Sequence, residues 1–395
     1  MSTLSDGGSL LFQELVDRVI DHLWDDKPSL GACTLVCSSW LPEARYHLFR
    51  EIILRFSNSC TEKLCLFPQS VQDEIWILYS RTRELELSLH DFTVKEIAIL
   101  VSKMPMLRWL RLDIQVLRHE QGSIMPVCPS VREITLRGVS LYESLLLMGL
   151  YLAFPNTRIL KISYPHNDMP PQTLPTELAL EYLEVEYGGI PLALLKDLPR
   201  TACKNTLRGL GLFAHTQYPP VLQNFPLEMK RNIRHLRLVL HGGLGLEEHN
   251  SNVTITCKCQ KLHCTRLISS YSVILAILST FPGLQDVSLT FSFTALTLSR
   301  PLEDQLPSLA ALPKGLQFLT IECDLRHSQG FPHGFPLIWK KLDSVVLQCP
   351  ELKLVRCLEY HARSYSDFSW PFSEESQQGI RELLPTLNAS GLLRF

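Results

Sequence analysis

Four potential metal ligands lie close together in the second half of the chain. Cys257, Cys259, His263 and Cys264 fall within eight residues, and cysteine sulfurs and histidine nitrogens are ligands that zinc prefers. Structural zinc sites usually place Cys-x-x-Cys-type pairs on either side of a longer run, and a Cys-x-Cys beside a His-Cys dipeptide strains that geometry. We therefore expect free thiols at these positions, with no metal site and no cofactor.

No motif for catalysis stands out. The chain contains no Gly-x-Ser-x-Gly nucleophile motif, no phosphate-binding loop ending in Gly-Lys-Ser/Thr, and no His-Glu-x-x-His metalloprotease motif. The glycines at 242, 243 and 245 follow an expected strand, but they lack the third glycine and the βαβ context of a dinucleotide site. The thirteen scattered histidines suggest no nucleophile–base pair. We therefore expect a binding protein and not an enzyme.

The residues best suited to bind a partner alternate with aliphatic residues in short expected strands. Successive side chains of a strand point to opposite faces, so the positions between the aliphatics face away from the core. Acidic residues, Glu184 among them, outnumber basic ones at these positions. Aromatic and arginine residues dominate the energetics of interfaces. The candidates of these types are Trp109, Arg111, Tyr182, Phe213, Arg237 and Phe318. The alternative is that neighbouring loops cover them.

An internal repeat generates these strands. The pattern aliphatic-x-x-aliphatic-x-aliphatic recurs, as in Leu107–Leu112 and Leu342–Leu347, and most of its central residues are 23 to 27 positions apart. This spacing lies within the period of leucine-rich repeats, in which each repeat buries its aliphatics only against its neighbours. The expected fold class is α/β. A leucine-rich-repeat-like solenoid with one short strand per repeat should cover residues 56–350, with an insertion at about 242–264, and residues 351–395 should cap it.

Residues 10–55 follow a different period and should form a separate helical module. Apolar residues recur at helical spacing over 11–23, and two further short helices are expected near Ser29 and Trp40. Three short helices cannot bury all their apolar faces against one another. Part of that surface must meet the next domain or a partner. The residues expected at a partner interface are Leu11, Phe12, Leu15, Val16, Ile20, Leu35, Val36 and Trp40.

The same segment resembles an F-box. The match lies in the run Leu11–Leu15, the Cys-x-x-Trp spacing of Cys37–Trp40, and the end at Ala44-Arg45. Together with Trp370–Ser376 near the C-terminus, it is similar to the large F-box-like group of mushroom-type fungi. Phe12 stands where that family usually has a proline. The resemblance implies that the module docks a Skp-type adaptor of a cullin-type ubiquitin ligase, and that the repeats bind a protein substrate.

Composition argues against several other functions. With 38 basic and 40 acidic residues and a pI near 6.7, the chain has no excess of positive charge for binding nucleic acid. The uncharged run Leu267–Gln285 is diluted by serines and contains Pro282, so no membrane span is expected. Met1–Ser9 has no lysine or arginine, unlike a secretory signal. We expect reduced cysteines and a location in the cytoplasm, the nucleus or both.

Two readings of the function remain. In the first, the chain is the substrate-receptor subunit of a Skp/cullin-type ubiquitin ligase and acts in the ubiquitin-like conjugation pathway. In the second, it is a non-degradative interaction scaffold whose helical module only caps the solenoid. Binding of residues 10–49 to a Skp-type adaptor separates the two.

Overall fold

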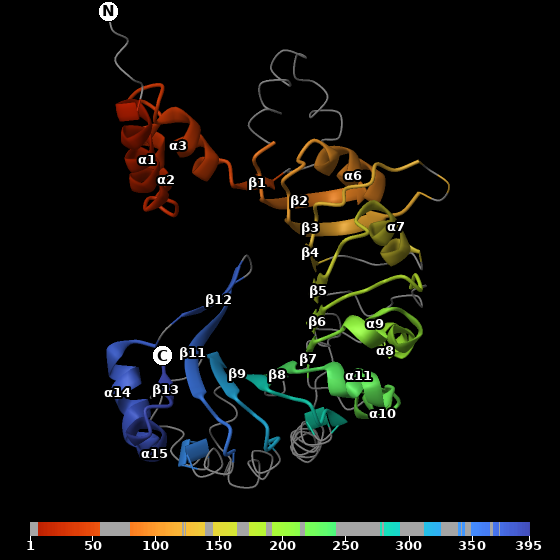
Figure 1. Ribbon diagram of the computed structural model, residues 1–395. Helices are drawn as coiled ribbons and strands as arrows, with labels where there is room; N and C mark the ends of the chain where they lie inside the picture. The colour runs from red at the N-terminus through yellow and green to blue at the C-terminus, as the bar shows by residue number, and fades with distance from the viewer. Residues whose placement is uncertain are drawn as a thin grey trace, which may run out of the picture. The chain divides into compact units, whose positions relative to one another are not determined.

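Figure 1 shows the computed structural model. It describes residues 7–55, 80–120, 122, 124–138, 145–163, 174–186, 192–213, 218–241, 277–278, 280–292, 312–324, 339–340, 342–343, 349–363, 366–370 and 372–395. The expected insertion at about 242–264, with its cysteines and His263, lies outside these residues. The chain divides into two compact units, Met1–Pro175 and Thr176–Phe395. Each unit is described by itself.

The first unit begins with the helices that the sequence predicted. They are α1 (Gly7–Asp21), α2 (Lys27–Cys33) and α3 (Leu41–Leu48). Asp26 caps α2 by accepting a hydrogen bond from the backbone N–H of Ser29, at 3.1 Å. Their shared core consists of Val16, Ile20, Leu30, Cys33 and Ala44, against which Leu23, Trp40 and Leu48 pack.

A parallel sheet follows in the same unit. Its described strands are β1 (Glu51–Arg55), β2 (Glu84–Thr93), β3 (Trp109–Arg118), β4 (Glu133–Arg137) and β5 (Ile159–Ser163). Helices α6 (Val94–Ser102) and α7 (Leu146–Ala153) lie between strands in the sequence and contact one another. The strands pair without offset, so equivalent positions form rows across the sheet. The buried row comprises Ile52, Leu85, Leu110, Ile134 and Leu160.

The second unit repeats the plan. Its described parallel strands are β6 (Tyr182–Glu186), β7 (Gly209–Phe213), β8 (His235–His241), β9 (Asp286–Ser292), β10 (Phe318–Asp324) and β11 (Leu354–Arg363). The helical segments between its strands include α8 (Leu192–Asp197), η1 (Leu198–Arg200), α9 (Cys203–Thr206), α10 (Tyr218–Gln223) and α11 (Leu227–Asn232). The buried row here comprises Leu183, Leu210, Leu236, Val287, Leu319 and Val355.

The C-terminal residues complete the strand pairing of this unit. Strand β12 (Ser366–Trp370) pairs antiparallel with β11, and the short β13 (Leu393–Arg394) pairs parallel with it. Helices α14 (Glu374–Leu383) and α15 (Pro385–Ala389) lie between them in the sequence. The buried Asp343 carboxylate accepts the backbone N–H groups of Thr386 and Leu387, at 3.1 and 2.9 Å. It thereby satisfies orphan donors in the first turn of α15.

Both units are therefore leucine-rich-repeat-like stacks of parallel strands, as the period of the sequence predicted. Within each stack the aliphatic positions of neighbouring repeats bury one another, which is how such repeats become stable. None of the described helices has both the length and the apolar character needed to cross a membrane.

Candidate partner-binding surfaces

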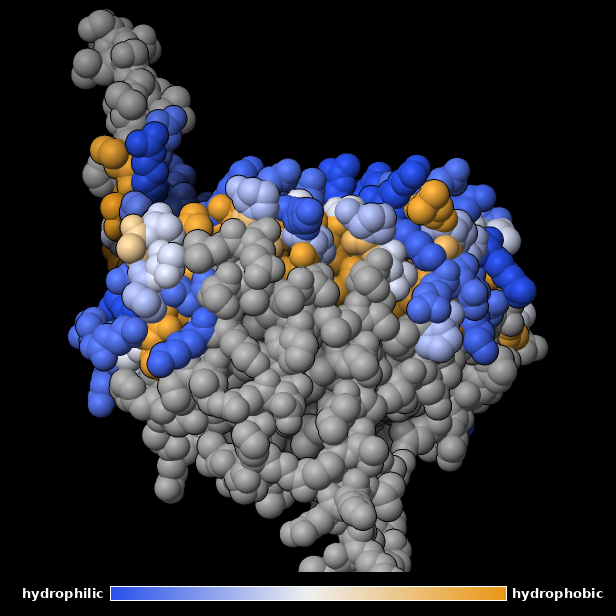
Figure 2. All heavy atoms as spheres, turned by 90° about the horizontal axis from the view of Figure 1, so that it is seen from below, coloured by the Kyte–Doolittle hydropathy of each residue, from blue (hydrophilic) through white to orange (hydrophobic). Residues whose placement is uncertain are grey.

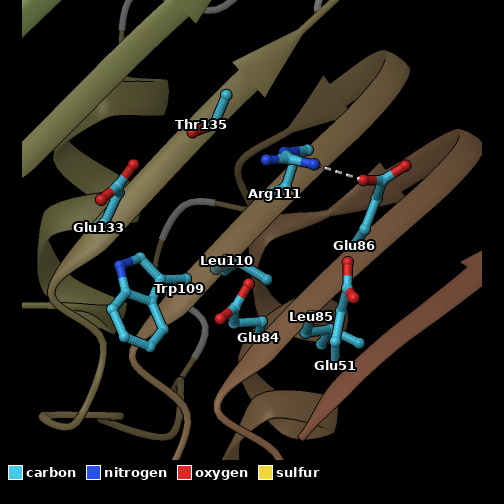
Figure 3. A pocket seen from close by; sticks show the side chains of 9 residues that line it. All are labelled: Glu51, Glu84, Leu85, Glu86, Trp109, Leu110, Arg111, Glu133 and Thr135. Carbon is cyan, nitrogen blue, oxygen red and sulfur yellow. Dashed lines mark hydrogen bonds and ion pairs between the residues drawn. The ribbon is translucent and has the colours of Figure 1, made fainter. Parts of the chain in front are cut away.

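A hollow of about 250 Å³ lies on the face of the first sheet that points away from its helices (Figure 3). It forms where four strands contribute their alternate, outward-pointing residues. Its lining is Glu51, Glu84, Leu85, Glu86, Trp109, Leu110, Arg111, Glu133 and Thr135. The lining contains four glutamates and one arginine, and each glutamate has a lysine or arginine within 4.0 Å.

Trp109 is the exposed aromatic residue of this hollow. Its side chain is 36% exposed, as the alternation in the sequence predicted. The strand register places Glu84 of β2 on one side of it and Glu133 of β4 on the other. Figure 3 shows the indole ring between these two side chains. The flat indole ring on β3 thus lies between carboxylates of the two strands on either side of it.

Arg111 forms another wall of the hollow and is bound within the chain. Its guanidinium donates to the Glu86 carboxylate at 2.8 Å, and the Glu86 side chain is largely buried. The sequence placed Arg111 at a partner interface. The structure brings it beside Trp109, but its charge is already directed to Glu86, and its Nε is buried with no hydrogen-bond partner in the described part of the chain.

The other three carboxylates of the hollow differ in how closely each pairs with a basic side chain. Glu133 is tightly paired with Lys161 of β5, at 2.8 Å. Glu84 lies 4.0 Å from Arg50, and Glu51 lies 3.5 Å from Lys27. In both of these looser pairs the two side chains are about one-third to one-half exposed, and exposed ion pairs of this kind contribute little free energy. The Glu51 and Glu84 end of the hollow is therefore its most available part.

On the corresponding face of the second unit, an arginine is enclosed by carboxylates. Arg237 of β8 donates to Glu184 of β6 and, at 3.2 Å, to Glu322 of β10. The Tyr182 hydroxyl donates to the same Glu184 carboxylate at 3.2 Å. Glu184 and Glu322 are buried. The sequence predicted Tyr182 and Arg237 as partner contacts and Glu184 as facing away from the core, whereas these side chains bind one another.

Two glycines on β7 make this arrangement possible. A Cβ atom at Gly209 would lie 2.2 Å from the ring of Tyr182, and one at Gly211 would lie 2.7 Å from Cγ of Glu184. Both distances are shorter than atoms can approach without displacement. The side chains of β6 therefore lie across β7, and Glu184 reaches Arg237 on the far side. The Gly-Leu-Gly-Leu alternation is the sequence signal for this close approach.

The two remaining residues predicted to contact a partner are phenylalanines of the second unit. Phe318 is 38% exposed and pairs in register with Asp286 of β9. It thus remains a candidate partner contact. The side chain of Phe213 lies outside the described residues.

The N-terminal helices carry a second candidate surface, which is apolar. Leu35 and Val36, in the connection between α2 and α3, are 85% and 59% exposed, and Leu15 and Val19 on α1 are also exposed. Figure 2 shows such apolar side chains in an otherwise largely hydrophilic part of the surface. Val19 was missing from the sequence-based interface, although it lies one helical turn after Leu15.

Of the other residues predicted for this surface, two are buried, one is partly buried, and two have side chains outside the described residues. Val16 and Ile20 are buried in the core of the helices and are therefore unavailable to a partner, since the α1 stripe turns them toward α2 and α3. Trp40 is partly buried against that core. The side chains of Leu11 and Phe12 lie outside the described residues.

A cluster that the sequence did not predict joins α1 to α3. The buried His47 Nε2 lies 2.8 Å from the Asp21 carboxylate and 3.4 Å from that of Glu43, and the potential ligand atoms of the three lie within 4.8 Å of one another. Burial and the nearby Asp21 charge raise the pKa of Glu43. A hydrogen bond between His47 and Asp21 explains the contact between the two helices, and we assign no ligand to it.

Comparisons with known proteins do not assign the chain to a family. No protein-family model matches the sequence, and no curated protein is significantly similar to it. Among the solved structures that match, one described as "Crystal structure of TLR13-ssRNA13 complex" has 11% sequence identity and a TM-score of 0.29, over 79% of this chain and 46% of that one. The chain thus spans less than half the length of that protein. The description of the fold as leucine-rich-repeat-like rests on the chain's own strands and registers.

Proposed function

We propose that this protein is the substrate-receptor subunit of a Skp/cullin-type ubiquitin ligase. The helical module would dock the adaptor, and the sheet face would hold a protein target. The observation that carries this proposal is the exposure of Leu35 and Val36, consecutive aliphatic residues in a short interhelical connection. Exposed aliphatics on a small helical module mark an interaction surface, because their burial against a partner contributes about 25 cal/mol per Å².

The sheet face of the first unit supports the second half of the proposal. It combines a hollow with an exposed tryptophan, and tryptophan is among the residues that most often dominate binding energy. In such an assembly the chemistry of ubiquitin transfer belongs to other subunits. This chain would contribute only the position of the target, which requires no catalytic residue of its own.

One observation favours the alternative of a scaffold with a capping module. Helix α3 contacts the turn that precedes β2: Arg81 donates to the carbonyl of Pro42 at 3.2 Å, and Thr82 donates to that of Phe49 at 3.1 Å. The Arg83 guanidinium also lies 5.2 Å from the centre of the Tyr46 ring. These contacts are what a cap on the first repeat would make.

A binding assay with purified Skp-type adaptor separates the two functions. Leu35→Asp with Val36→Asp should abolish capture of the adaptor, since burying two unpaired carboxylates costs several kcal/mol, or a loss of affinity of more than about 100-fold. Both side chains are exposed in the free chain, so the variant should keep its fold, as judged by circular dichroism and thermal denaturation.

The matched control is Ile124→Asp with Val127→Asp, because these aliphatics are equally exposed but lie outside the helical module. This control should bind the adaptor like the unmodified chain. If the unmodified chain fails to bind the adaptor, or if the Leu35 and Val36 variant binds it undiminished, the scaffold function replaces the ligase function.

A further inference from the structure

We propose that the hollow around Trp109 binds a lysine or arginine side chain presented by the protein partner. This inference rests on the proposed binding of a protein by the sheet face, but it does not require the adaptor to dock. It is carried by the size of the hollow, its exposed carboxylates, and the indole ring that lies between two of them.

The size of the hollow fits one long side chain. Sites for drug-sized molecules usually measure about 300 to 1,000 Å³, whereas this one measures about 250 Å³ and opens on a sheet face. Its floor is the strand backbone at Leu85 and Leu110, whose side chains are buried in the core on the opposite face. The methylene groups of a lysine or arginine would pack against the exposed indole of Trp109.

The exposed carboxylates beside Trp109 favour a cation over an anion. Glu51, Glu84 and Glu133 lie in one row with Trp109, since their strands pair without offset. Arg111, the cation of the lining, belongs to the next row and points to Glu86 (Figure 3). A cation over the indole would be attracted by the ring and by the carboxylates on both sides. An anion entering the same place would meet only repulsion from them.

The second unit shows how this chain satisfies carboxylates gathered on the same kind of face. There the arginine of a central strand, Arg237, lies between Glu184 and Glu322 from strands on either side. Arg237 follows the buried aliphatic of its strand, so the equivalent row of the first unit is that of Glu86 and Arg111, which is likewise paired within the chain. The preceding row, with Trp109 between Glu84 and Glu133, has no lysine or arginine at its described strand positions, and a basic side chain from a partner would supply one.

The probes for this proposal are fluorescein-labelled octapeptides of alternating glycine and lysine, glycine and glutamine, or glycine and glutamate. Fluorescence anisotropy at low ionic strength should show binding of the lysine peptide to the full chain, and no binding of the other two. Glu84→Gln with Glu133→Gln should weaken that binding by about tenfold or more, and so should Trp109→Leu, while Trp109→Phe should lose less because it keeps an aromatic face.

The charge-matched control is Glu228→Gln with Glu375→Gln, two exposed glutamates on α11 and α14. It removes the same net charge and should change the affinity less than about twofold. Equal losses in the two double variants would mean attraction by overall charge only and would overturn the proposal. So would undiminished binding by a folded Trp109→Leu variant, or equal binding of the lysine and glutamine peptides.

The peptide assay and the adaptor assay test the two proposals independently. A chain that binds adaptor but ignores the lysine peptide leaves the ligase function intact and refutes the Trp109 site. A chain that binds the lysine peptide through Trp109 but ignores adaptor keeps the site and refutes the ligase function.

Discussion

Replacing Gly211 by alanine tests the enclosed arginine of the second unit directly. The new Cβ atom would lie 2.7 Å from Cγ and 3.0 Å from Cβ of Glu184. Glu184 must therefore move away from β7, and its ion pair with Arg237 weakens or breaks. The alanine backbone itself brings no strain at this strand position, so any penalty comes from that contact.

The expected penalty follows from three contributions. Overpacking of an interior usually costs about 1–3 kcal/mol. Breaking a buried ion pair can cost about 3–5 kcal/mol, but here the loss is smaller because Arg237 keeps Glu322 at 3.2 Å and is 18% exposed. Replacing a strand glycine by alanine returns about 0.5–1 kcal/mol of conformational entropy. The net change should be a loss of about 2 kcal/mol in the free energy of unfolding.

Urea unfolding of the full chain measures this loss as a lower midpoint at an unchanged slope. The control is Gly315→Ala in the same unit, where the nearest atom would be 4.0 Å away. It should stay within about 0.5 kcal/mol. Adding Gly211→Ala to Glu184→Ala should cost little more than Glu184→Ala alone, because the clashing side chain is gone. A neutral Gly211→Ala, or a penalty that persists in full without Glu184, would refute the reasoning.

Two further predictions concern titrating groups. The exposed Cys37 thiol has its pKa lowered by hydrogen bonding with Ser39, whereas burial raises the pKa of Cys357 to about 12. Iodoacetamide at neutral pH should thus modify Cys37 well before Cys357, and equal modification rates by mass spectrometry would contradict this. Because the folded pKa of Glu43 is raised above its unfolded value, its contribution to stability is present at low pH and is lost as the pH rises through the folded pKa. Urea midpoints measured across the acid range should fall less with rising pH in Glu43→Gln, and identical pH profiles would refute this.

The repeating core of both units could be predicted from the sequence. Aliphatic residues at fixed spacing, such as Leu110 and Leu183, have to face inward because a strand exposes every second residue to the opposite face. The same rule predicted correctly that Trp109 is exposed. Local alternation is sufficient here because each repeat only has to match its neighbours.

The contacts among outward residues could not be predicted in this way. Alternation puts Glu184 and Arg237 on the face away from the core, but they lie on strands separated by β7. Whether they meet depends on the size of the residue between them. The two side chains can meet because the intervening residue, Gly211, has no side chain. The pattern of aliphatic residues gives no information about the residue at that position.

The helical module shows a similar limit. Helical spacing identified the apolar stripe of α1, but it could not tell which edge of the stripe faces α2 and α3. Val16 and Ile20 are inside, and Leu15 is outside. The packing angle of neighbouring helices makes that choice, and it depends on residues far along the chain, as the pairing of Asp21 with His47 also does.

The pairing of β11 has a consequence for the synthesis of the chain. On one side β11 bonds to β10, and on the other its first residues bond to β13 and its last to β12. Until the ribosome has added residues 366–395, that second edge has unpaired backbone groups to which another strand can add. At about 5–20 residues per second, the exposure lasts roughly 2–6 s. A nascent chain stalled in this interval should be prone to aggregation, and chaperones that recognise open strand edges should bind it there.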